Sequence, residues 1–104
     1  RRIGTGRLNR RLHEVVETRP PPVRGGRRFK LLYATQVEGG PGRVEPPRFV
    51  IFVNDPCLLD AAYLRYLAGE IRALEPYPGL PLLLELRGRP QGERGDGRTL
   101  LRTA

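Results

Sequence analysis

Residues 49–56 read Phe-Val-Ile-Phe-Val-Asn-Asp-Pro, and this stretch decides the fold. A continuous apolar run rich in β-branched and aromatic side chains is typical of a strand that is covered on both faces. The Asn54-Asp55-Pro56 sequence that follows is a helix start signal, because capping side chains precede a proline at the first helical position. We therefore expect a central strand over residues 49–53 that leads directly into a helical segment.

A second strand is predicted upstream, over residues 29–37. Its odd-numbered residues, from Phe29 to Val37, fall on one face, and its even-numbered residues, from Lys30 to Gln36, fall on the other. Glycines and prolines are concentrated in residues 39–47, which predicts a long hairpin loop between the two strands.

Two amphipathic helices flank these strands. The first is predicted over residues 6–18, with Thr5 as its N-cap, and it must stop before Pro20 because proline disfavours helix in the preceding residue. The second follows Asp60, which offers a further cap, and it ends at Pro76. Apolar residues recur at helical spacing in both segments.

A last strand is predicted over residues 82–86. The connection that reaches it from the central strand contains a helix, so these two strands can pair parallel through a right-handed crossover. The expected fold class is therefore α+β, in the order α-β-β-α-β, with a three-stranded mixed sheet and both helices packed on one face. We predict a linker over residues 1–4, a folded domain over 5–89 and a disordered tail, rich in glycine and arginine, over 90–104.

The predicted core consists of the residues on the apolar stripes of the helices and in the apolar strands. They are Leu8, Leu12, Val16, Leu31, Tyr33, Phe49, Ile51, Leu64, Leu67, Ile71, Leu82 and Leu84.

The net charge of +8 is concentrated near the start of the chain. Residues 1–28 hold nine arginines against Glu14 and Glu17, whereas the rest of the chain is nearly neutral. Such a patch attracts polyanions, and arginine forks onto phosphate oxygens and stacks on bases. Nucleic acid and an acidic protein surface are both possible partners at this point. The candidate nucleic-acid-binding residues are Arg7, Arg10, Arg11, Arg24, Arg27, Arg28, Arg87 and Arg89.

Motifs for catalysis are lacking. The only lysine, Lys30, lies in a predicted strand rather than in a phosphate-binding Gly-Lys-Ser or Gly-Lys-Thr loop. His13, the only histidine, has no partner at a spacing that suits metal binding or acid–base chemistry, so we interpret it as a helix-surface residue. Cys57, the only cysteine, is interpreted as a small packing residue, and Tyr63 and Tyr66 as the edge of the core. No apolar run is long enough to span a bilayer, so no membrane partner is expected.

Several short motifs resemble the C-terminal KH-like domain of the Der (EngA) family of bacterial tandem GTPases. Tyr33-Ala34-Thr35-Gln36-Val37, the later Phe52-Val53-Asn54 and the helical Tyr63-Leu64-Arg65-Tyr66-Leu67 form the most specific combination. The resemblance covers roughly residues 1–89, and further matches are Thr5, Leu8-Asn9, Glu14, Val16-Glu17, Pro20-Pro21-Pro22, Lys30, Pro46-Pro47, Phe49-Val50, Arg87 and Arg89.

The resemblance implies a function. It implies a KH-like fold and a non-catalytic domain that binds the large ribosomal subunit through rRNA and regulates a GTPase in ribosome biogenesis. Residues 1–4 would then connect to a preceding GTPase domain, and the parent protein's GTPase domains would bind GTP and Mg²⁺ and hydrolyse GTP to GDP. For the chain itself the resemblance implies no cofactor and no small-molecule substrate. It implies a cytoplasmic location.

One feature of ordinary KH domains is missing. They grip nucleic acid through a Gly-x-x-Gly loop between two helices. Here that junction is residues 59–62, which contain no glycine and include Asp60. The tetrads that fit the pattern, residues 39–42 and 92–95, lie in the predicted hairpin loop and in the predicted tail. The sequence therefore predicts that RNA binding by this chain departs from the ordinary KH mode.

Two other functions remain open. The first is a docking domain that binds only the GTPase domains of its own parent protein. The second is a small stand-alone enzyme, which the lack of a nucleophile–base pair or metal-ligating cluster disfavours.

Overall fold

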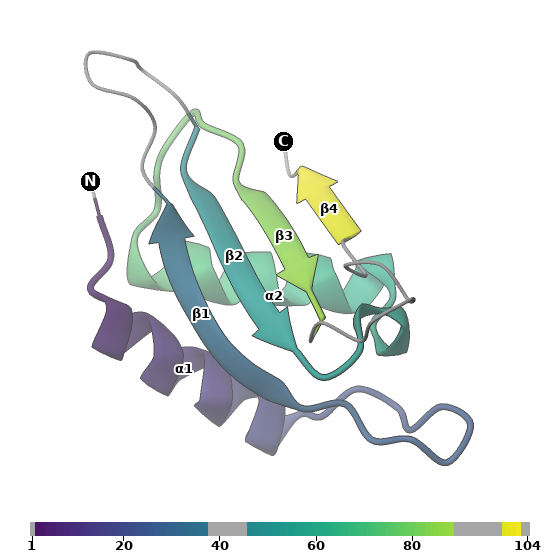
Figure 1. Cartoon of the computed structure of the whole chain (residues 1–104). Helices are drawn as coiled ribbons and strands as arrows, with labels where there is room; N and C mark the ends of the chain where they lie inside the picture. Colours follow the sequence, from purple (N-terminus) through teal and green to yellow (C-terminus); the bar gives the residue numbers. More distant parts are fainter. Residues whose placement is uncertain (1, 38–45, 89–98, 103–104) are drawn as a thin grey trace.

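The computed structural model describes residues 2–37, 46–88 and 99–102. The strands form one sheet in the order β1-β2-β3-β4, and both helices lie behind it in Figure 1. In chain order the elements are α1 (Thr5–Thr18), β1 (Leu31–Val37), β2 (Arg48–Val53), the 3₁₀ turn η1 (Pro56–Leu58), α2 (Ala61–Leu74), β3 (Leu83–Arg87) and β4 (Thr99–Arg102).

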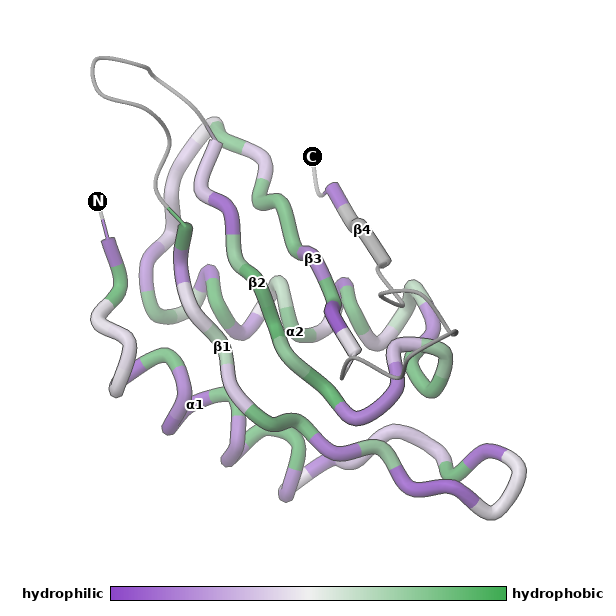
Figure 2. Tube along the Cα trace, viewed as in Figure 1, coloured by the Kyte–Doolittle hydropathy of each residue, from purple (hydrophilic) through white to green (hydrophobic). Residues whose placement is uncertain are grey.

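The pairing of the strands matches the sequence prediction. β1 pairs antiparallel with β2, and β2 pairs parallel with β3 through the crossover that contains α2. Figure 2 shows that β2 is hydrophobic along most of its length, as expected for a central strand. The predicted α+β, KH-like arrangement with helices packed on one face of a mixed sheet is therefore confirmed.

β4 corrects the prediction of a disordered tail for residues 99–102, and the rest of the segment 90–104 lies outside the described residues. Residues 99–102 pair antiparallel with β3, so that Arg102 lies opposite Leu83 and Thr99 lies opposite Leu86. Without this partner β3 would present a row of unpaired backbone N–H and C=O groups at the edge of the sheet. The three predicted strands are all present, and β4 adds a fourth strand beside β3.

A bulge in β1 changes which side chains face the core. The pairing of β1 with β2 shifts register between Leu31 and Tyr33. An extra residue at a bulge sends the following side chains to the opposite face. Leu31 and Ala34 are therefore both buried, while Tyr33 is 47% exposed. The prediction that Tyr33 lies in the core is wrong for this reason.

The core fills the space between the helices and the sheet. Apart from Tyr33, the predicted core residues are buried, except Val16, which is partly buried against them. Ile3 also belongs to the core, and its backbone N–H donates to Gln36 Oε1 at 2.8 Å. The packed domain thus begins before Thr5, inside the predicted linker. Gly4, not Thr5, is the N-cap residue of α1, and no side chain caps this end.

Side chains of α1 form hydrogen bonds with backbone groups at the outer edge of β1. Asn9 Nδ2 donates to the backbone oxygen of Ala34 at 2.7 Å, and the Ala34 N–H donates to Asn9 Oδ1 at 2.7 Å. His13 Nε2 lies 3.1 Å from the backbone oxygen of Leu31, and His13 is exposed, as predicted. These side chains thus bind backbone groups of β1 that could otherwise pair with another strand.

We predict that Leu67→Ala lowers the free energy of unfolding by about 2–5 kcal/mol, because it opens a cavity at a fully buried position of α2. The measurement is urea unfolding followed by circular dichroism. Arg65→Ala is the control, since Arg65 is exposed on the same helix, and it should change stability by less than about 0.5 kcal/mol. Equal stability of Leu67→Ala and the unmodified chain would contradict the assigned role of α2.

Candidate nucleic-acid interface

The basic segment after α1 is a tight turn. Arg24 and Arg27 form a β-bridge in which each backbone N–H donates to the other residue's oxygen, at 3.2 and 2.8 Å. The two residues between them, Gly25 and Gly26, have φ values of +56° and +73°. Two successive positive φ angles are the geometry of a type I′ turn, which favours glycine at both positions. We call residues 24–28 the basic turn.

The basic turn is held against the start of η1 and against the junction between η1 and α2. The Arg27 guanidinium lies 2.6 Å from Asp55 Oδ2, and the Arg24 guanidinium lies 3.3 Å from Asp60 Oδ2. This junction is the position at which ordinary KH domains carry their Gly-x-x-Gly loop. Residues 59–62 have no glycine, so a basic turn from elsewhere in the chain stands beside the junction instead.

Asp55 and Asp60 have double roles. Asp55 caps η1 by accepting from the Cys57 N–H, and Asp60 caps α2 by accepting from the Tyr63 N–H, as predicted for both acids. The hydrogen bond from Cys57 and the neighbouring Arg27 hold the pKa of Asp55 below its ordinary value of 3.8. The capping hydrogen bonds therefore hold both carboxylates in place, independently of their ion pairs with arginine.

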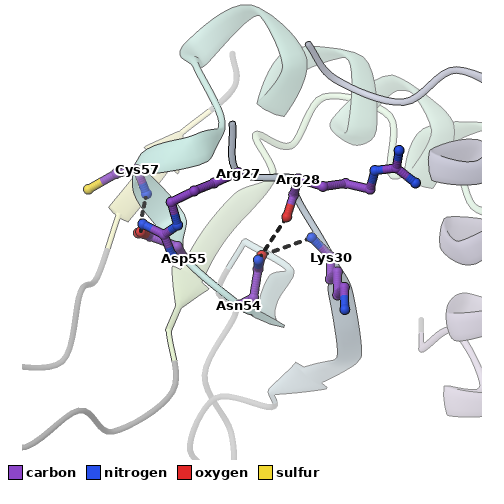
Figure 3. Close-up of polar contacts among 6 residues, drawn as sticks. All are labelled: Arg27, Arg28, Lys30, Asn54, Asp55 and Cys57. Carbon is purple, nitrogen blue, oxygen red and sulfur yellow. Dashed lines mark hydrogen bonds and ion pairs between the residues drawn. The ribbon is translucent and has the colours of Figure 1, made fainter. Parts of the chain in front are cut away.

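Asn54 ties the end of the basic turn to the end of β2 (Figure 3). Asn54 Nδ2 donates to the backbone oxygen of Arg28 at 2.9 Å, and the Lys30 N–H donates to Asn54 Oδ1 at 2.8 Å. In Figure 3 the Arg27 side chain reaches toward Asp55, whereas the Arg28 side chain points away from this cluster. Arg28 also lines a groove of about 500 Å³ with Val16 and Phe29.

The arginines of α1 differ in what they contact. Arg11 pairs with Glu70 of α2 at 2.6 Å and with Glu14 at 3.4 Å, and the hydrogen bond that Arg11 donates to Glu70 raises the pKa of Arg11. Arg7 donates to the backbone oxygen of Leu74, at the end of α2, at 3.4 Å. Arg10 is exposed and has no polar partner among the described residues. Arg7 and Arg11 therefore join the two helices, and only Arg10 is directed at solvent alone.

The candidate arginine of β3 also has an acidic partner. Arg87 Nε donates to Glu85 Oε2 at 2.6 Å, and Arg48 of β2 donates to Glu85 Oε1 at 2.6 Å. The hydrogen bond from Arg87, and then that from Arg48, hold the pKa of the 1%-exposed Glu85 below its ordinary value of 4.5. Arg89 lies outside the described residues, as do the Gly-x-x-Gly tetrads at 39–42 and 92–95.

The other side chains singled out in the sequence are Cys57, Tyr63 and Tyr66. Cys57 is exposed, so its interpretation as a packing residue is wrong. Tyr63 and Tyr66 are partly buried against the core, as predicted. Tyr63 donates its hydroxyl to the backbone oxygen of Arg19, and burial raises its pKa to about 12. Among the described residues there is no group of acids, histidines and cysteines that could hold a metal ion. None of the described helices is long and apolar enough to cross a membrane.

The sequence shows the arginines but not their partners. The contact of Asn54 with Arg28 has no distinctive sequence signal, since asparagine is also a common helix cap, and Arg48 is not among the candidate residues that the sequence indicates. Of the candidate arginines, Arg10 and Arg28 retain an exposed side chain without a polar partner in the described part of the chain. Exposed guanidinium groups on a folded scaffold suit the binding of phosphate oxygens.

Comparison with known proteins places the chain in a sequence family. A family profile described as "KH-domain-like of EngA bacterial GTPase enzymes, C-terminal" matches residues 2–87. GTPase Der of Desulforudis audaxviator (strain MP104C) is 44% identical over 89 residues, which are 86% of this chain and 19% of that relative. GTPase Der of Bartonella henselae is 45% identical over 87 residues, 84% of this chain and 17% of that relative. The chain thus spans only 17–19% of the length of these curated relatives.

We predict that Arg11→Glu lowers the melting temperature, whereas Arg10→Glu leaves it nearly unchanged. The first change places a carboxylate beside Glu70 and Glu14, where like charges repel, and the second acts on a side chain without a described partner. Thermal unfolding followed by circular dichroism measures both. Equal melting temperatures for the two variants would contradict the role assigned to the Arg11–Glu70 pair.

We also predict that Glu85 makes the free energy of unfolding depend on pH. Its folded pKa is depressed, so its contribution is complete above the ordinary value of 4.5 and is lost as the pH falls through the folded pKa. Glu85→Gln should lower the free energy of unfolding by roughly 1–3 kcal/mol at about pH 7 and by less at about pH 3. Urea unfolding at both pH values measures this. Glu14→Gln is the control, because Glu14 is exposed and only loosely paired.

Proposed function

This chain belongs to the family of KH-like C-terminal domains of EngA bacterial GTPases, and from that premise we propose that it is a ribosome-binding, regulatory domain. Its partner is the rRNA of the large ribosomal subunit, and it acts in ribosome biogenesis. The parent protein is a cytoplasmic GTPase whose other domains bind GTP and Mg²⁺. Its relatives carry the name GTPase Der, and the chain supplies only a small part of their length.

The observation that carries this proposal is the basic turn beside the η1–α2 junction. Arg27 and Arg24 fix the turn to Asp55 and Asp60, and Asn54 fixes its end to β2. These three contacts restrict the turn that carries Arg28, and a restricted backbone lowers the entropy cost of a phosphate contact. The turn takes the place of the absent Gly-x-x-Gly loop as the element that contacts the RNA backbone.

The chain contributes binding and not catalysis to the parent protein. The sequence contains no P-loop, and the only lysine, Lys30, follows the basic turn rather than a glycine-rich loop before a helix. The regulation that we propose is indirect: nucleotide bound to the GTPase domains changes how the parent protein presents this domain to the ribosome.

A second candidate function is intramolecular docking on the parent protein's GTPase domains. Two observations favour it. Four candidate arginines, Arg11, Arg24, Arg27 and Arg87, pair with acids of the same chain, which reduces the charge available to RNA. The groove beside Arg28 is lined mainly by apolar and proline side chains, including Val16, Pro21 and Phe29, which suits a protein surface.

We predict that the double variant Arg10→Glu, Arg28→Glu weakens binding of the chain to purified large ribosomal subunits without changing its melting temperature. Both side chains are exposed and lack polar partners in the described regions, so reversal removes phosphate contacts and leaves folding intact. Co-sedimentation across a salt series is the measurement. The slope of log affinity against log salt should fall by roughly 1 for each phosphate group that the variant no longer neutralises.

Arg65→Glu is the matched control. Arg65 is also exposed and without a described partner, but it projects from α2. Its reversal should weaken binding less than the double variant does. Undiminished binding of the double variant at every salt concentration would overturn the rRNA proposal and leave docking on the GTPase domains as the function.

A further inference from the structure

The face of the sheet opposite the helices carries three rows of side chains. Cross-strand pairing aligns Tyr33 of β1 with Phe52 of β2, and Phe52 with Arg87 of β3. We call the surface formed by this row and its two neighbours the open face. No described helix covers it, and in Figure 1 it is turned toward the viewer.

The first row holds an aromatic pair in which Tyr33 is exposed and Phe52 is partly buried. The rings of Tyr33 and Phe52 have centroids 6.4 Å apart and planes inclined at 34°. Tyr33 is 47% exposed, and it is one of the few large apolar side chains of the described residues that lie at the surface. The bulge in β1 is what turns Tyr33 outward, so a local departure from strand geometry creates this surface.

The row at the other end of the open face adds an apolar and basic surface. Val37, which is 40% exposed, pairs across the sheet with Arg48, and Leu83 of β3 pairs with Arg102 of β4. Arg102 is exposed. The middle row contains Val50 and Glu85, and both are buried.

The exposed charge of the described open face is entirely positive. Glu85 is its only acid, and it is 1% exposed, whereas the side chains of Arg48 and Arg87 are 47% and 34% exposed. Glu85 holds both guanidinium groups in place, at 2.6 Å each. The buried acid therefore orients two cations that remain accessible on either side of it.

We propose that the open face binds single-stranded RNA, with an unpaired base stacked on Tyr33 and the backbone phosphates along Arg87, Arg48 and Arg102. Exposed aromatic rings flanked by guanidinium groups on a sheet are the combination with which sheet surfaces bind unpaired nucleotides. Exposed charge of one sign fits a polyanion better than a protein surface of mixed charge. The choice of RNA as the polyanion rests on the proposed function, but the open face and the basic turn are separate surfaces.

The test measures binding of short oligouridylate and oligoadenylate strands to the 104-residue chain by fluorescence anisotropy. Three variants separate stacking from simple apolar contact. Tyr33→Phe keeps the ring and should bind as tightly as the unmodified chain. Tyr33→Ala should raise Kd roughly five- to 150-fold, as expected when one base–aromatic stack is removed. Tyr33→Leu should resemble Tyr33→Ala, since it keeps apolar area without a π face.

Two further measurements locate the contact. Ring-proton shifts of Tyr33 and Phe52 in nuclear magnetic resonance spectra should move on addition of the oligonucleotides. Duplex RNA of the same length should bind more weakly than the single strands, because its bases are not free to stack. Arg102→Gln should reduce the slope of log affinity against log salt by roughly 0.7, the value for one phosphate of a single strand.

The proposal is overturned if Tyr33→Ala and the unmodified chain bind single strands with the same Kd, or if duplex binds as tightly. It is also overturned if Tyr33→Ala affects only binding to a GTPase domain of a Der relative, which would make the open face a protein surface. These outcomes are distinct from failure of the proposed function, because large-subunit binding is tested through Arg10 and Arg28. If the double variant loses binding to the large subunit while Tyr33→Ala binds single strands as tightly as the unmodified chain, only the stacking inference is overturned.

Discussion

The paired hydrogen bonds between the Asn9 side chain and the backbone of Ala34 are the interaction on which the arrangement of this domain depends. They attach α1 to the outer edge of β1 through a side chain, because the backbone groups of a helix are already paired within the helix. With α1 in this position, Arg11 reaches Glu70 and Arg7 reaches the end of α2, so the two helices are joined along one seam. The attachment also closes part of the β1 edge, which would otherwise be open to pairing with another chain.

The sequence was sufficient for the order of elements and for most of the core. The apolar run of residues 49–53 and the helical spacing of the two apolar stripes are local patterns, so each element could be recognised from its own residues. The bulge in β1 and the strand β4 could not be predicted in this way. The bulge depends on how β1 pairs with β2, and β4 depends on the free edge of β3, so neither is determined by the residues of the segment itself.

The candidate site was predicted less completely, for an electrostatic reason. Composition locates arginines but not the acids that approach them in the fold. Arg27 and Asp55 are far apart in sequence, yet their side chains are 2.6 Å apart in the structure, and the same is true of Arg11 and Glu70. The N-terminal excess of charge is therefore partly neutralised by residues from later in the chain. The set of arginines without an acidic partner is smaller than the sequence indicated, and Arg48, which lies outside that excess, is itself paired with Glu85.

These ion pairs do not make the basic turn inert toward a polyanion. Arg24 and Arg27 are about half exposed, and pairs of this kind contribute at most about 1 kcal/mol each. An arginine has five N–H donors in a planar fork, so a carboxylate on one edge leaves other donors for a phosphate oxygen. The acids fix where the guanidinium groups lie, and they also weaken long-range attraction to any negative surface. Binding by this domain should therefore depend more on the fit between fixed arginines and phosphate positions than on net charge alone.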